Sequence, residues 1–317
     1  MKIVLLNDLL INPGLYEGVK KDLASLGHTF TYYLRKPRND EEIVKRIKDA
    51  DILITDNTKL SEEVLKQVKN LKYIDVAFTG YDHIPLEFCK ANKINVSNCS
   101  GYATEAVAEL NLAFILSLLR DIKANDTKVR KSKTHNNQLG EELDTKVVGV
   151  IGTGKIGACL IDLLQPFNLR VLAYSKTIKK NIVSKGVTYV DLKDIMSKSD
   201  FICLTLPLND ETKNLIGERE IALMKPTAYL INTARGGIVD ESALINALKE
   251  KKIKGAALDV FSIEPPLSKD NELLKLDNVL LSPHIGYMTK EAMKKRAEIA
   301  FSNLYSYLEG KIKNKII

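Results

Sequence analysis

The sequence predicts an α/β protein with two domains, each built on a parallel sheet that helices cover. Short apolar runs alternate with amphipathic segments from residue 2 onwards, which is typical of βαβ units. The alternation stops at a long helical pattern and restarts near residue 147. The length of 317 residues also suits two domains.

The first block of alternation ends near residue 98. Apolar runs such as DILIT, at 51–55, suit strands that are buried on both faces of a sheet. Strands are expected at 2–6, 30–34, 51–55, 72–78 and 94–98, and helices at 15–27, 41–50, 61–70 and 86–92.

A long helix is expected over residues 104–126, because apolar positions cover much of its circumference. The polar stretch 127–146 has little hydrophobic pattern and is expected to be a surface connection between domains. An amphipathic pattern at 289–311 predicts a closing helix. Between them, strands are expected at 147–152, 170–175, 187–190, 201–207, 228–234, 255–260 and 279–284, and helices at 156–167, 191–199, 219–225 and 242–250.

Composition argues against several classes of protein. The net charge is +7, but no aromatic residues interleave with the basic runs, so a solvated lysine-rich surface is favoured over a nucleic-acid groove. The four cysteines form no C-x-x-C pair, which favours free thiols in a reducing compartment, and no metal is expected. No signal peptide is evident and the longest apolar run is too short for a bilayer, so we expect a cytoplasmic protein without membrane contact.

A glycine-rich loop follows the first strand of the second block. Residues 147–157, VVGVIGTGKIG, hold Gly152, Gly154 and Gly157 in the G-x-G-x-x-G spacing, between a strand pattern and a helix pattern. This context predicts a Rossmann-type dinucleotide site, in which Lys155 and Ile156 complete the loop. The helix N-terminus would supply N–H groups and partial positive charge for phosphates. The alternative is a glycine-rich turn without a ligand.

The end of the next strand selects the cofactor. An acid at this position bonds the ribose 2′-OH and favours NAD. The sequence instead places Ser175 and Lys176 there, with Lys179 and Lys180 downstream and no acid until Asp191. Serine donates to a 2′-phosphate and lysine neutralises it, so NADP(H) is favoured over NAD(H), with dual use as the alternative.

Polar residues end three later strands of the second block. Arg235, Asp259 and His284 follow strand patterns, and Glu264 lies in the loop after Asp259. In open α/β sheets, ligands bind beyond the carboxyl ends of the strands. Histidine titrates near neutrality and suits proton transfer to a carbonyl oxygen, with Glu264 as the carboxylate that orients it. Arginine suits a substrate carboxylate, which makes Arg235 the candidate. Taken alone, each residue is more simply explained as a packed histidine or a surface ion pair.

These motifs together resemble the D-isomer-specific 2-hydroxyacid dehydrogenase family. The resemblance rests on VVGVIGTGKIG, on LINTARGGIVDESALINALKEKKIKGAALDVFSIEPP, on NVLLSPHIGYMT and on earlier segments such as NCSGYATEAVAEL, so it covers nearly the whole chain. It implies nicotinamide-dependent reduction of a 2-oxo acid to the D-2-hydroxy acid, with Arg235, Glu264 and His284 as catalytic residues. It implies that the backbone N–H groups around Thr79 and Gly80 bind the substrate carboxylate.

The resemblance also implies a domain organisation. Residues 1–101 and 288–317 would form the substrate (catalytic) domain and residues 102–287 the dinucleotide-binding Rossmann domain, giving two Rossmann-like/flavodoxin-like α/β domains separated by a cleft. The long helix would help to form a homodimer. The remaining residues implied at the cofactor site are Thr104, Pro207, Thr212, Thr233, Ala234, Asp259 and Gly286.

Some features depart from the family or leave the substrate open. The acid at the ribose position is missing, and Thr205 stands where many members have histidine. The segment NCSGYATEAVAEL is most similar to the glycerate dehydrogenase, or hydroxypyruvate and glyoxylate reductase, branch. A phosphoglycerate or D-lactate dehydrogenase remains an alternative. So does a non-enzymatic, cofactor-sensing binding module similar to a corepressor.

Overall fold

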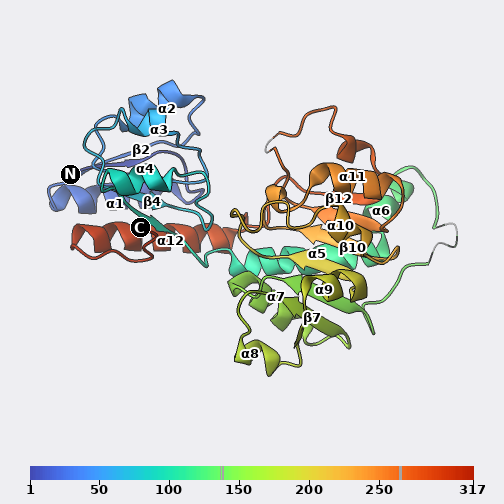
Figure 1. The fold of residues 1–317 in the computed structure, drawn as a ribbon. Helices are drawn as coiled ribbons and strands as arrows, with labels where there is room; N and C mark the ends of the chain where they lie inside the picture. Colours follow the sequence, from blue (N-terminus) through green and yellow to red (C-terminus); the bar gives the residue numbers. More distant parts are fainter. Residues whose placement is uncertain (136, 138, 264–265) are drawn as a thin grey trace. The chain divides into compact units, whose positions relative to one another are not determined.

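The computed structural model describes residues 1–135, 137, 139–263 and 266–317. The chain divides into two compact units, of which unit 1 comprises Met1–Ala103 and Met288–Ile317 and unit 2 comprises Thr104–Tyr287. The boundaries expected from the sequence were 101/102 and 287/288. Both chain ends lie in unit 1 (Figure 1). Among the described helices, none has the length and hydropathy needed to cross a membrane.

Unit 1 is a parallel sheet with helices packed against it. Its described strands pair in the order β2-β1-β3-β4-β5, and every pairing is parallel. The C-terminal helix α12 packs against β4. The strands are β1 (Lys2–Leu5), β2 (Thr29–Tyr32), β3 (Ile52–Thr55), β4 (Tyr73–Val76) and β5 (Asn95–Asn98), and the helices are α1 (Pro13–Ser25), α2 (Asp40–Ile47), α3 (Glu62–Leu65), α4 (Leu86–Ala91) and α12 (Lys290–Leu308).

Unit 2 holds the second parallel sheet. In its described residues the strand order is β12-β11-β10-β9-β6-β7-β8, again with parallel pairing throughout. The strands are β6 (Val147–Ile151), β7 (Arg170–Tyr174), β8 (Thr188–Tyr189), β9 (Phe201–Leu204), β10 (Tyr229–Asn232), β11 (Gly255–Leu258) and β12 (Val279–Leu281). The helices are α5 (Thr104–Arg120), α6 (Ile122–Arg130), α7 (Lys155–Leu164), α8 (Lys180–Val183), α9 (Leu192–Lys198), α10 (Glu218–Ala222) and α11 (Glu241–Lys249), with short 3-10 helices at Gly236–Ile238 and Glu272–Lys275.

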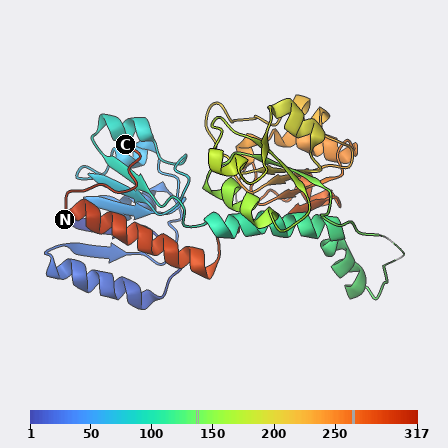
Figure 2. The same ribbon diagram turned by 90° about the horizontal axis from the view of Figure 1, so that it is seen from below.

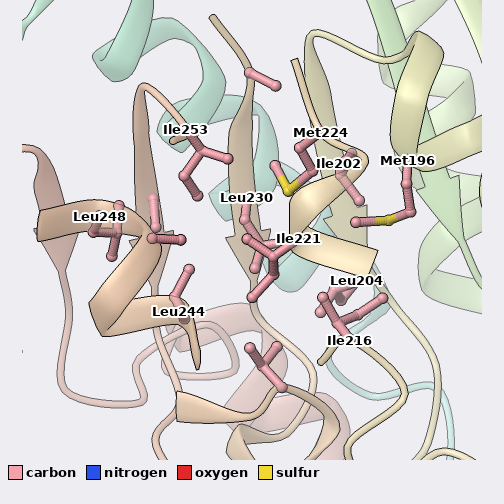
Figure 3. Close-up of a cluster of buried hydrophobic side chains, with 14 of the residues drawn as sticks. Met196, Ile202, Leu204, Ile216, Ile221, Met224, Leu230, Leu244, Leu248 and Ile253 are labelled. Carbon is pink, nitrogen blue, oxygen red and sulfur yellow. The ribbon is translucent and has the colours of Figure 1, made fainter. Parts of the chain in front are cut away.

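The sheet of unit 2 is buried between two apolar layers. The layer shown in Figure 3 joins side chains of β9 and β10 to those of α9, α10 and α11, among them Met196, Leu230 and Leu248. A second layer packs α5 and α7 on the other face through residues such as Ile115 and Ile161. The prediction of two α/β units with parallel sheets is confirmed.

The expected helix over 104–126 is broken. It forms α5 and α6, and between them Asp121 takes a left-handed backbone with a φ of 47°. Aspartate tolerates that conformation better than most residues. Figure 2 shows α6 running in a different direction from α5 after this turn. The polar stretch 127–146, expected to connect the domains, begins in α6, and its described residues lie within unit 2.

Candidate functional site

The carboxyl ends of the unit 2 strands carry the candidate site. Strands β7 and β8 lie on one side of β6, and β9 to β12 lie on the other side. The strand order therefore reverses at β6, and ligands of doubly wound sheets bind at such a point. The register places Asn232, Leu258 and Leu281 side by side at the ends of β10, β11 and β12. The residues that follow them share one edge of the sheet.

The glycine loop has the shape that a dinucleotide pyrophosphate requires. Gly152 has a φ of 99°, which favours glycine. A Cβ on Gly157 would lie 2.0 Å from the carbonyl oxygen of Gly152, so the loop and α7 touch at this point. A Cβ on Gly154 would meet no described atom within 4 Å, so the backbone is open to a ligand there. Lys155 and Ile156 begin α7, whose N-terminal N–H groups attract phosphate. The residues therefore fit the predicted cofactor.

Side chains from three other segments support this loop. The Thr205 hydroxyl donates to the carbonyl oxygen of Gly152 at 2.6 Å. The Tyr189 hydroxyl donates to Oγ1 of Thr153 at 2.9 Å, and Nζ of Lys179 donates to the carbonyl oxygen of Thr153 at 2.6 Å. Sequence reasoning did not assign these roles, because no local spacing links the residues to the loop.

At the position that is predicted to select the cofactor, Lys176 meets an acid from a distant loop. Ser175 and Lys176 follow β7, as predicted, and Nζ of Lys176 forms an ion pair with the carboxylate of Glu211. Glu211 belongs to the loop after β9 and lies 35 residues further along the chain. The local sequence holds no acid between Ser175 and Asp191, as expected, but an acid from further along the chain meets Lys176, because the sheet places the loops after β7 and β9 on either side of β6.

The loop after β9 also holds two of the residues implied at the cofactor site. The Thr212 hydroxyl donates to the carbonyl oxygen of Pro207 at 2.6 Å and accepts from the N–H of Asn209 at 2.8 Å. Oδ1 of Asn209 accepts from the N–H groups of Glu211 and Thr212, at 3.0 and 3.1 Å. These bonds fix the turn, and Asn209 is a further residue that the sequence did not single out.

Arg235 follows β10 in a turn that Asn232 holds. Nδ2 of Asn232 donates to the carbonyl oxygen of Arg235 at 2.9 Å, and its Oδ1 accepts from the N–H of Ala234 at 3.0 Å. Asn111 of α5 donates to Oγ1 of Thr233 at 2.7 Å. The side chain of Arg235 is partly buried, and Nη1 donates to the carbonyl oxygen of Ala234 at 2.9 Å. The guanidinium is therefore partly desolvated, which strengthens its attraction for a carboxylate.

Gly236 packs the chain after β11 against this turn. A Cβ at this position would lie 1.9 Å from the carbonyl carbon and oxygen of Phe261. No side chain fits there, so only glycine allows the turn after Arg235 to pack this closely against the backbone of Phe261. The N–H of Ser262, the next residue, donates to Oε2 of Glu241 at 3.0 Å. Glu264, the predicted partner of the histidine, lies outside the described residues.

His284 follows β12 in a conformation that few residues adopt. Its φ is 55°, in the left-handed region, where strain is typical of functional sites. Its N–H donates to the carbonyl oxygen of Ser282 at 3.1 Å, and its ring meets that of Tyr287 edge to face, with centroids 5.4 Å apart. The side chain is partly exposed, so it is accessible to a substrate.

The carboxylate of Asp259 holds the turn on which His284 lies. Asp259 is 1% exposed and directly follows β11. Oδ1 accepts from the Ser282 hydroxyl and from the N–H of Ile285 at 2.8 Å, and Oδ2 accepts from the N–H of Gly286 at 2.8 Å. Burial raises the pKa of Asp259, although these hydrogen bonds and the positive charge of a protonated His284 act to lower it.

Of three further predicted site residues, one lies at the start of unit 2 and two lie in unit 1. Thr104 is the first residue of α5. Thr79 and Gly80 belong to unit 1 and follow β4, where Nδ2 of Asn98 donates to the carbonyl oxygen of Thr79 at 2.7 Å. In the described ranges, no group of three or more His, Cys, Asp and Glu residues is arranged to hold a metal ion.

Comparison with known proteins gives the family context. The sequence model of the D-isomer specific 2-hydroxyacid dehydrogenase NAD binding domain matches residues 112–286. A glyoxylate reductase of Thermococcus litoralis is 39% identical over 285 residues, which cover 87% of this chain and 86% of that protein. A hydroxypyruvate reductase of Blautia hydrogenotrophica is 33% identical over 317 residues, which cover 98% of this chain and 98% of that protein. The solved structure of an acyclic imino acid reductase in complex with NADPH and D-Arg superposes with a TM-score of 0.90, at 33% identity and 100% coverage of both chains.

Proposed function

Because the chain belongs to the D-isomer specific 2-hydroxyacid dehydrogenase family and is an oxidoreductase with a nicotinamide cofactor, we propose that it reduces hydroxypyruvate or glyoxylate to the D-2-hydroxy acid. One observation carries this proposal: Arg235 and His284 follow strands of one sheet, at the edge where the glycine loop lies. The names of the glyoxylate and hydroxypyruvate reductases among the relatives support these two substrates.

His284 is the proposed proton donor. When bound, the nicotinamide supplies the hydride to the carbonyl carbon, and negative charge builds on the carbonyl oxygen. His284 protonates that oxygen, and in the reverse direction it accepts the proton. The proposed role of Glu264 is to orient the ring and to favour the imidazolium. Asp259 acts through the backbone of the same turn, so it is a positioning residue as well as a proposed neighbour of the cofactor.

Arg235 is the proposed ligand of the substrate carboxylate. Its planar guanidinium matches two carboxylate oxygens, and partial burial limits competition from water. The backbone N–H groups of Thr79 and Gly80 are proposed to bind the same carboxylate. The proposed cofactor contacts are the glycine loop, Thr104, Ser175, Lys176, Pro207, Thr212, Thr233, Ala234 and Gly286.

We favour NADP(H) over NAD(H) as the cofactor. Lys176 and Lys180 are exposed after β7, where the 2′-phosphate would lie, and Ser175 is able to donate a hydrogen bond to it. The imino acid reductase among the structural relatives is described with NADPH, which supports the same choice.

A second activity follows from that structural relative. Reduction of the imine of a 2-oxo acid needs the same hydride transfer, with His284 donating its proton to nitrogen in place of oxygen. The similarity extends over the whole of both chains. We expect this activity where the 2-oxo acid is supplied together with a high concentration of ammonia or methylamine.

The chain is also proposed to form a homodimer in the cytoplasm. Leu116, Ile122, Val129 and Leu139 are large apolar side chains that are exposed along α5, α6 and the chain after them. Exposed apolar groups on neighbouring segments are typical of an interface. The four cysteines are free thiols, which suits a reducing compartment. Light scattering after size-exclusion chromatography measures the oligomeric state, and a Val129→Asp variant is expected to shift it towards monomer.

The test of the proposed reaction is the loss of reduced-nicotinamide absorbance. Hydroxypyruvate, glyoxylate, pyruvate and 2-oxobutyrate are each assayed with NADPH and with NADH, without amine and with ammonia. Turnover of hydroxypyruvate or glyoxylate with NADPH supports the proposal. Turnover that appears only with amine supports the imine reductase, and turnover with NADH alone contradicts the cofactor preference. Tight cofactor binding without turnover of any pair favours the binding module.

A further inference from the structure

An ion pair joins the two loops that flank the glycine loop. Lys176 follows β7 and Glu211 follows β9, and β6 lies between these strands in the sheet. The pair therefore connects the two sides of the strand that carries Gly152. Both side chains remain accessible, with exposed fractions of 74% for Lys176 and 63% for Glu211. A ligand at the glycine loop is thus able to reach either group.

The turn that carries Glu211 is fixed by its own hydrogen bonds. Oδ1 of Asn209 accepts a hydrogen bond from the N–H of Glu211, and the Thr212 hydroxyl donates to the carbonyl oxygen of Pro207. Glu211 is therefore presented from an ordered turn. An ion pair between two exposed side chains contributes little to stability. The fold therefore gains little from this pair.

Lys179, a second lysine near this position, has a different partner. Nζ of Lys179 donates to the carbonyl oxygen of Thr153 and so supports the glycine loop. Lys176 instead pairs with the carboxylate of Glu211, which lies on the other side of β6. A 2′-phosphate that approaches Lys176 therefore meets Glu211 as a competitor for the same ammonium group.

We propose that Glu211 is a specificity-determining residue that supplies, from the loop after β9, the carboxylate that is missing after β7. With NAD(H), the Glu211 carboxylate accepts a hydrogen bond from the ribose 2′-OH, the role that an acid at the strand end plays in other dinucleotide sites. When NADP(H) binds, its 2′-phosphate pairs with the ammonium group of Lys176, and the Glu211 carboxylate repels this phosphate. The ion pair between Lys176 and Glu211 therefore reduces the preference for NADP(H) over NAD(H) that Ser175 and Lys176 create. This inference rests on the proposed binding of a nicotinamide dinucleotide at the glycine loop.

Calorimetric titration of the whole chain with NADPH and with NADH tests the proposal. Removing the negative charge in Glu211→Gln is expected to raise the ratio of NADPH to NADH affinity by about three- to tenfold, since a phosphate then no longer meets a like charge. Glu211→Asp keeps the charge and is expected to keep the ratio near that of the wild type. Lys176→Gln is expected to lower the ratio by a similar factor. The shift in Glu211→Gln should shrink at high salt.

A second exposed ion pair of unit 2 provides the control. Lys249 and Glu272 pair as Lys176 and Glu211 do, but Lys249 is the last residue of α11 and lies near the first residues of β10 and β12. Glu272→Gln removes the same charge from the protein as a whole and is expected to leave the ratio unchanged. Equal shifts in Glu211→Gln and Glu272→Gln overturn the proposal, as does a ratio in Glu211→Gln that stays within twofold of the wild type.

The titration also separates this inference from the proposed reaction. If the wild-type chain binds both dinucleotides but reduces no 2-oxo acid, the proposed reaction fails while the ratio in Glu211→Gln still decides the role of Glu211. If the wild-type chain binds neither dinucleotide, the proposed cofactor site and the role of Glu211 are both wrong.

Discussion

The carboxylate of Asp259 accepts the backbone N–H of Gly286 at 2.8 Å and so links the end of β11 to the turn after β12. The same carboxylate accepts the N–H of Ile285 and the hydroxyl of Ser282, the residues on either side of the Pro283–His284 pair. His284 is held in a left-handed backbone between these bonds. A buried acid therefore fixes the backbone of the turn that carries the proposed proton donor.

Asp259→Asn is expected to loosen this turn. An amide has one acceptor oxygen in place of two, so at least one of the three donors loses its partner, at a cost of about 1–3 kcal/mol where that donor is buried. We expect a lower midpoint of thermal unfolding and a fall in kcat that exceeds the change in KM. Ser282→Ala is the control, because both backbone N–H bonds to Asp259 remain. A kcat in Asp259→Asn equal to that of Ser282→Ala would show that the carboxylate does not position His284.

Two adjacent glycines test the packing beside Arg235. Gly236→Ala places a Cβ 1.9 Å from the backbone of Phe261, so the chain after β11 must move, and we expect a loss of about 1–3 kcal/mol of stability together with most of the activity. Gly237→Ala meets only the flexible end of Leu208, at 3.2 Å. It is expected to change both quantities much less. Denaturant unfolding and kcat/KM of the two variants are compared, and similar losses in both would contradict the role of Gly236.

Gly157→Ala tests the cofactor loop. Its Cβ would lie 2.0 Å from the carbonyl oxygen of Gly152 and 2.8 Å from the Thr205 hydroxyl, so the loop must shift. We expect the Kd values of NADPH and NADH to rise together, by about tenfold or more, because both share the pyrophosphate. Gly18→Ala, in α1, is the matched helix substitution, and no described atom lies within 4 Å of its Cβ. It is expected to leave both Kd values unchanged, and unchanged binding in Gly157→Ala would refute the assignment of the loop.

Asp75 predicts a pH dependence of stability in unit 1. Complete burial raises its pKa from 3.8 to about 8, although Nδ2 of Asn303 donates to its Oδ1 at 2.9 Å. The folded chain therefore keeps this proton up to about pH 8, whereas the unfolded chain loses it near pH 4. Stability contributed by this group is present at low pH and is lost as the pH rises from about 4 to about 8.

Asp75→Asn removes that titration, so its unfolding midpoint should fall less than that of the wild type between pH 4 and pH 8. Glu141→Gln is the contrasting control. Hydrogen bonds from Lys146 and Lys254 lower the pKa of Glu141 to about 2, so its contribution is lost only as the pH falls below about 4.5. Parallel midpoint curves for wild type and Asp75→Asn across pH 4–8 would contradict the assigned pKa.

The sequence predicted what depends on local pattern. Strand and helix periodicity located both sheets, and the glycine spacing located the loop before α7. The sequence did not predict contacts that depend on which strands lie next to one another in the sheet. Glu211 reaches Lys176 only because β9 and β7 flank β6, and Thr205 reaches Gly152 for the same reason. The break at Asp121 also escaped prediction, because the apolar pattern continues through it and the left-handed backbone has no local signal.

The most direct test of the account is the turnover of His284→Ala beside the wild type. The kcat and KM for hydroxypyruvate and glyoxylate are measured with NADPH, and the Kd of NADPH is measured on the same preparations. We predict a kcat at least 100-fold lower, since the variant lacks the general acid, with a Kd within about twofold of the wild type. A variant that binds NADPH normally and turns over within threefold of the wild type would show that His284 is not the proton donor.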